Sequence, residues 1–131
     1  MKYSITSFLI VIIIGLSSHT FKQFQDTNKS IVWTKSSHDF GTIKQGETVE
    51  TIFSFQNMGK DTLTIENVMG SCGCLATSWT KQSILPTQKG NVTVKFDSNG
   101  KNGQHMKSVT VYTNLGAYYL EIKANIIKQT D

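Results

Sequence analysis

The sequence contains no arginine, since all 13 of its basic residues are lysines. The lysines are spread along the chain, and the formal net charge is only +4. Proteins that bind nucleic acids commonly use arginine for bidentate contacts and gather basic residues on one face. The lack of arginine and of a basic cluster therefore argues against nucleic acid as a partner.

The short motifs of several enzyme classes are also missing. There is no glycine-rich phosphate loop before a helix, no G-x-S-x-G and no H-E-x-x-H. Acidic residues such as Asp39, Glu47 and Glu66 are scattered and form no suggestive pair. We therefore expect no catalytic residue and no cofactor, and we expect that the protein is not an enzyme.

Long hydrophobic runs are absent except for residues 8–16 (FLIVIIIGL), which follow Lys2 and precede Ser17 and Ser18. A positive residue, a short apolar run and small residues are typical of a secretory signal. The run is too short for a spanning helix, which needs about 20 apolar residues. We expect a signal peptide at residues 1–20 and a polar linker at residues 21–30. The protein should then be exported to the periplasm or cell envelope, or secreted further, with no membrane span after signal removal.

The remaining residues, 31–128, show the period-two pattern of half-buried strands and no helical period. Apolar and polar residues alternate in residues 49–55, 92–96, 109–113 and 120–126, with turn-forming residues between these segments. Phe53 and Phe55 fall on the predicted inner face, and Ile52 falls on the outer face. About seven short strands predict one all-β domain, an immunoglobulin-like antiparallel β-sandwich. A small barrel is the alternative.

Residues 38–46 (HDFGTIKQG) resemble the opening H-x-F-G-x-I-x-x-G of a bacterial family, the domain of unknown function 1573. The run Ser71-Cys72-Gly73-Cys74 resembles the signature of that family, and the resemblance covers roughly residues 33–115. It implies an immunoglobulin-like sandwich exported in bacteria, with no established activity. Two positions depart from the pattern. A Pro-Gly turn is expected where Pro86-Thr87 stands, and a bulkier residue or proline is expected at Gly70.

The only cysteines are Cys72 and Cys74, separated by Gly73. An oxidising compartment would favour a local disulfide, although a bridge that closes so few residues contributes little stability. A redox pair needs a positive group that lowers the thiol pKa, and no lysine, arginine or histidine lies within six residues. The pair could also remain a free dithiol that contacts a partner.

A metal site is the fourth hypothesis, because two thiolates at this spacing can bind Cu(I) or Zn. Met69 could add a thioether, and His105, Met106 and His38 are further candidate ligands, but a complete site needs three or four ligands. The sequence leaves all four hypotheses open. The leading function is a non-enzymatic binding or structural module that presents the Cys-Gly-Cys loop to an unknown protein or cell-envelope partner. The alternative is a thiol redox or Cu(I)/Zn-handling protein that uses the two cysteines.

Overall fold

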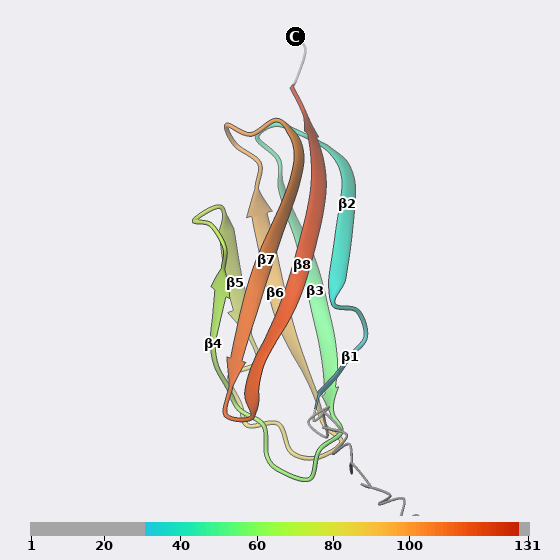
Figure 1. The fold of residues 1–131 in the computed structure, drawn as a ribbon, viewed down its shortest axis with the longest axis vertical. Helices are drawn as coiled ribbons and strands as arrows, with labels where there is room; N and C mark the ends of the chain where they lie inside the picture. The colour runs from blue at the N-terminus through green and yellow to red at the C-terminus, as the bar shows by residue number, and fades with distance from the viewer. Residues whose placement is uncertain (1–30, 129–131) are drawn as a thin grey trace, which may run out of the picture.

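The computed structural model describes residues 31–128, which form two packed β-sheets (Figure 1). No helix occurs in this part of the chain, and therefore none there could span a membrane. The strands are β1 (Ile31–Trp33), β2 (Ser37–Lys44), β3 (Thr48–Asn57), β4 (Ile65–Gly70), β5 (Leu75–Trp79), β6 (Lys89–Asp97), β7 (Gly103–Thr113) and β8 (Gly116–Ile127). The predicted all-β, immunoglobulin-like sandwich is confirmed, but it has eight strands where about seven were expected.

The additional strand arises at the beginning of the domain. Strands β1 and β2 are separate and belong to different sheets, whose strand orders are β1-β3-β6-β5 and β2-β8-β7-β4. The chain crosses between the sheets after β1. Strand β2 then pairs with β8 in parallel, whereas the other pairings among residues 31–128 are antiparallel.

Apolar side chains from both sheets meet between the layers and form the core. Phe53 and Phe55 on β3 are 0% and 2% exposed, whereas Ile52 is 50% exposed. The predicted inward face of β3 is therefore confirmed. The other core side chains from the alternating segments are Val92, Val94, Phe96, Val109, Val111, Leu120, Ile122, Ala124 and Ile126. Period-two alternation places them on the inner faces because successive side chains on a strand point to opposite sides.

The turn before β6 contains a threonine in a backbone conformation that favours glycine. Thr87 has φ +72°, the only positive φ among the non-glycine residues in the described part of the chain. Two hydrogen bonds hold it there: its N–H donates to the Asn57 carbonyl at 2.7 Å, and its carbonyl accepts from Gln56 Nε2 at 2.8 Å. A β-branched residue is strained in this region. The Pro-Gly turn expected at this position is therefore replaced by Pro86-Thr87 in glycine-like geometry.

Replacing Thr87 by glycine should raise the free energy of unfolding by about 1 kcal/mol, because the strain removed exceeds the added freedom of the unfolded chain. Denaturant titration provides the measurement. Thr110→Gly, inside strand β7, is the matched control and should lower stability. A loss of stability in Thr87→Gly would show that the threonine side chain contributes more than its conformation costs.

Candidate functional site

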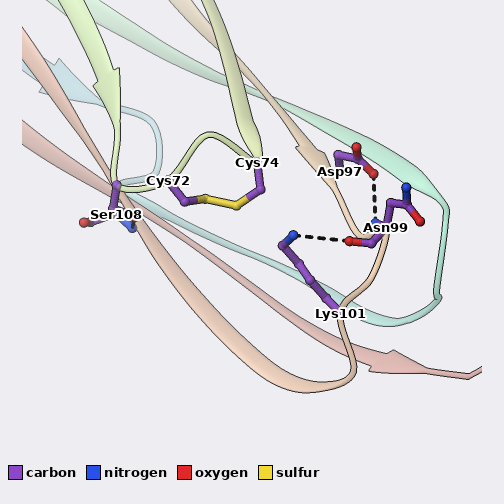
Figure 2. Close-up of a disulfide and its surroundings, with 7 residues drawn as sticks. Cys72, Cys74, Asp97, Asn99, Lys101 and Ser108 are labelled. Carbon is purple, nitrogen blue, oxygen red and sulfur yellow. Dashed lines mark hydrogen bonds between the residues drawn. A yellow bond between two sulfur atoms is a disulfide. The ribbon is translucent and has the colours of Figure 1, made fainter.

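The two cysteines lie where the chain passes from one sheet to the other. Strand β4 ends at Gly70 and β5 begins at Leu75, and these strands belong to different sheets. The connection between them, residues 71–74, is called the cysteine turn below. Within it Cys72 and Cys74 form a disulfide with their Cα atoms 5.2 Å apart (Figure 2). The bridge therefore closes the turn at a corner of the sandwich.

Backbone hydrogen bonds attach the cysteine turn to both sheets. On one side, the N–H of Ser71 donates to the Ser108 carbonyl at 2.9 Å, and Ser71 Oγ accepts from the Ser108 N–H at 3.2 Å. On the other side, the Cys74 carbonyl accepts from the N–H of Asp97 at 3.0 Å. Ser108 lies on β7 and Asp97 ends β6. The position of the turn is thus fixed by the sandwich as well as by the disulfide.

The residue before the turn must be small. A Cβ atom added at Gly70 would lie 2.6 Å from the Cβ atom of Leu75, closer than nonbonded carbon atoms approach. The two strand ends therefore pass in close contact, and glycine permits this approach. This contact explains why Gly70 occupies a position where the family resemblance predicted a bulkier residue or proline.

The cysteine turn combines a packed side with an exposed side. Cys74 packs against the hydrophobic core, and both cysteines are half-buried. Ser71 and Gly73 are exposed, and Met69 beside them is 53% exposed. A partner can therefore contact the turn at these exposed residues without opening the sandwich.

A lysine distant in the sequence lies near the disulfide. Figure 2 shows Lys101 among the residues that surround the bridge, with its Nζ atom donating to the Asn99 carbonyl at 3.4 Å. The sequence did not indicate this residue, because Lys101 is far from the cysteines along the chain. Lys101 lies in the loop between β6 and β7, and the sequence did not show which loops share an end of the sandwich. The surroundings of the disulfide thus include one basic residue, Lys101, and one acidic residue, Asp97.

The two methionine candidates lie apart on the outer face of one sheet. Met69 is paired with Thr110 of β7, and Met106 is four residues away along that strand. At about 3.3 Å per residue, their backbones are separated by roughly 13 Å. Met106 is 61% exposed. Because Ser71 of the cysteine turn bonds to Ser108, two residues from Met106, the turn joins β7 between the levels of the two methionines.

The histidine candidates make other contacts. The ring of His105 faces the interior, 6.4 Å from the Phe96 ring, and its Nε2 is 2.9 Å from the Asn102 carbonyl oxygen. His105 also borders a hollow of about 460 Å³ beside the bulge in β2.

His38 lies on β2, at the sheet edge opposite β4. Burial and the nearby Lys35 ammonium, at 2.9 Å from Nδ1, lower the pKa of His38. Within residues 31–128, no three His, Cys, Asp or Glu side chains gather as a metal site.

Replacing both cysteines by serine should lower the free energy of unfolding by no more than about 1–2 kcal/mol. The bridge closes a very short loop, so it removes little entropy from the unfolded chain, and the backbone bonds of the turn remain available. Circular dichroism should show an intact fold, and denaturant titration should give the difference in stability. Collapse of the fold would instead show that the turn organises the core.

Comparison with known proteins gives one family match. The model of a family described as "Protein of unknown function (DUF1573)" matches residues 31–126 of this chain. No curated protein matches the sequence.

Solved structures share the fold at low sequence identity. A protein of unknown function from Porphyromonas gingivalis W83 has a TM-score of 0.63 at 16% identity, over 72% of this chain and 46% of that one. The ASH/PapD-like domain 7 of human CEP192 also has a TM-score of 0.63, at 12% identity, over 77% of this chain and 87% of that one. The secreted serine protease VesC from Vibrio cholerae has a TM-score of 0.59 at 11% identity, over 78% of this chain and 24% of that one. This chain thus spans less than half of the Porphyromonas protein, and these likenesses establish the fold alone.

Proposed function

This chain belongs to the family of proteins of unknown function DUF1573, and from that premise we propose that it is an exported, non-enzymatic module that binds a protein of the cell envelope through the cysteine turn. The proposal rests on one observation: the turn is exposed at Ser71 and Gly73, yet it is attached to both sheets. A loop already held in one conformation loses less entropy on binding than a mobile loop. Binding residues are often found on loops that a rigid scaffold positions.

The role of the disulfide in this proposal is to fix the shape of the binding loop. The sandwich has its own buried core, so the cross-link is not needed to hold the two sheets together. Met69 supplies exposed apolar surface next to the turn. No residue is assigned a catalytic role.

Site-specific photo-cross-linking in cells tests the proposal. A photoreactive amino acid replaces Gly73, where an added Cβ atom meets no other atom within 4 Å. The control carries the same group at exposed Lys60, in the connection after β3. The proposal predicts one defined cross-linked protein from position 73 and none from position 60. Equal products from both positions, or none from position 73, would contradict it.

The proposal includes export. Export depends on residues 1–20, which lie outside the described part of the chain. If residues 1–20 are a secretory signal, the mature protein should begin between about residues 17 and 25. N-terminal sequencing of exported protein, or its intact mass, makes the measurement. A membrane-bound form that retains Met1 would contradict this prediction.

Thiol exchange is a second candidate, favoured by the position of Lys101 near the disulfide. A nearby cation stabilises a thiolate and so lowers the pKa of the thiol. In this reaction, a partner dithiol attacks the bridge through one thiolate to form a mixed disulfide, and one cysteine thiol is released. The second partner thiol then completes the exchange, so the partner is oxidised to a disulfide and Cys72 and Cys74 are reduced.

Acid trapping followed by alkylation separates the two candidates. Thiol exchange predicts that part of the exported protein carries two alkyl groups, and that this part grows when cells lose oxidising capacity. A pair that stays fully oxidised under both conditions argues for the binding role. The remaining alternative, Cu(I) or Zn handling, requires the cysteines as thiolates, so metal bound by the reduced protein should be lost in the double serine variant.

A further inference from the structure

Strand β5 is an outer strand whose free edge begins directly after the cysteine turn. It pairs only with β6, and all five of its residues keep one register. The Cys74 carbonyl and the Thr80 N–H both bond toward β6, to Asp97 and Asn91. Since backbone groups alternate in direction along an antiparallel strand, the groups of Leu75, Thr77 and Trp79 point away from β6.

These outward groups have few partners within residues 31–128. The N–H of Leu75 donates to the Cys72 carbonyl at 3.2 Å, inside the turn. The backbone groups of Thr77 and Trp79 and the carbonyl of Leu75 make no such bond to the described residues. The side chain of Thr77 instead donates to the Val68 carbonyl of β4 at 3.0 Å. The edge of β4 is thus partly covered, and the edge of β5 is left open.

Natural proteins commonly protect open strand edges with charged residues, proline, bulges or very short strands. Three edge strands of this sandwich carry such protection. Strand β1 has three residues, β2 has a bulge and charged residues, and β4 has Glu66 and an irregular register. Strand β5 (LATSW) has no charged residue, proline or bulge. Of the four edge strands, β5 therefore has the fewest features that oppose pairing with another chain.

A lysine lies at one end of this edge. Lys81 follows Trp79 and places its ammonium 3.1 Å from the centre of the Trp79 ring. At the other end, where β5 begins, Figure 2 shows both Lys101 and Asp97 among the residues near the disulfide. No carboxylate occurs in residues 71–81. The edge is therefore uncharged along its length and positive at the end where Lys81 lies.

We propose that β5 accepts an extended, acidic segment of a protein partner as an added strand of the β1-β3-β6-β5 sheet. The backbone groups of Thr77 and Trp79 would pair with the backbone of the segment, and its acidic residues would lie near Lys81. Strand addition of this kind obtains affinity from main-chain hydrogen bonds. The proposal rests on the proposed function, and it specifies how the partner binds beside the cysteine turn.

The first test uses a displayed library of random decapeptides as the probe and the oxidised full-length protein as the target. Peptides that bind should be rich in Asp or Glu. In amide hydrogen exchange followed by NMR, they should slow the Thr77 and Trp79 amides by more than about tenfold. The amides of Ala76 and Ser78 already face β6 and serve as internal controls, with little change. A library that gives no binder, or binders that protect another strand, would overturn the proposal.

The second test examines the hydrogen bonds themselves. Methylation of the peptide backbone at single nitrogens should weaken binding by more than about tenfold at every second residue only. In the protein, Thr77→Pro removes the outward N–H, while Thr77→Val keeps it and removes only the hydroxyl. Binding should be lost in the proline variant and kept in the valine variant. If the proline variant does not fold, the peptide methylation series decides whether strand addition occurs. A loss of binding that does not recur at every second peptide residue would contradict strand addition.

The outcomes separate this inference from the function on which it rests. Cross-linking from position 73 together with no protection of Thr77 and Trp79 would reject strand addition and leave the binding role intact. Absence of cross-linking from position 73 would reject the binding role at the cysteine turn, whatever peptides bind to β5.

Discussion

Replacing Phe53 by alanine is expected to lower the free energy of unfolding by about 3–5 kcal/mol, as for a fully buried aromatic side chain. Phe53 is 0% exposed and lies opposite Val92 on the neighbouring strand, inside the cluster formed by both sheets. The Lys35 ammonium also lies 5.6 Å from the centre of its ring. The truncation therefore leaves a cavity in the core and removes the ring from beneath a half-buried cation. Equilibrium denaturation measures the loss.

The adjacent residue provides the matched control for that prediction. Ile52 lies on the same strand but faces outward and is 50% exposed. Ile52→Ala should therefore cost much less than Phe53→Ala, because it removes far less buried surface. Equal losses would mean that the side chains of β3 do not alternate as described. The same titrations give the slope with denaturant, which should be similar for both variants if the unfolded states are comparable.

Replacing Asn57 by alanine should lower the free energy of unfolding by about 2–4 kcal/mol. Asn57 is 0% exposed, and its Nδ2 donates to the carbonyls of Asp61 and Ile84, both at 2.9 Å. Its Oδ1 accepts from the N–H of Gly59 at 3.0 Å. Alanine leaves three backbone groups without these partners, and a buried group without a partner costs about 1–3 kcal/mol. The side chain thus joins the connection after β3 to the connection before β6.

An exposed asparagine supplies the comparison for this second prediction. Asn99→Ala, in the loop after β6, should change stability by less than about 0.5 kcal/mol, as is usual for a surface position. A loss at Asn57 no larger than that at Asn99 would show that water replaces the three hydrogen bonds of the Asn57 side chain. Thermal unfolding of both variants measures the same difference through their midpoints.

The strands and their inner faces could be predicted from the sequence because period-two alternation is a local signal. Phe53, Val94 and Val109 all lie on the inner faces that this alternation indicated. The assignment of β1 and β2 to different sheets could not be predicted in the same way. That division depends on the pairing of β2 with β8, which is far away in the sequence.

The sequence indicated where the candidate site lies along the chain. It did not indicate which distant residues surround that site. The Cys-Gly-Cys pattern identified the turn, but Ser108, Asp97 and Lys101 reach it from β7, from β6 and from the loop between them. Thr87 shows the same limit, because a threonine gives no local sign that its backbone adopts φ +72°. Only the family resemblance indicated that glycine is usual there. Contacts between segments distant in sequence set both features.

The measurement that tests the central claim most directly is the yield of photo-cross-linking from position 73 with and without the disulfide. The protein with Cys72 and Cys74 is compared with the Cys72→Ser, Cys74→Ser variant in the same cells and at matched amounts. If the bridge fixes the binding loop, the yield should fall by more than about tenfold in the serine variant. Circular dichroism should meanwhile show an intact sandwich. An unchanged yield in the serine variant would contradict the claim that the disulfide shapes the surface that the partner binds.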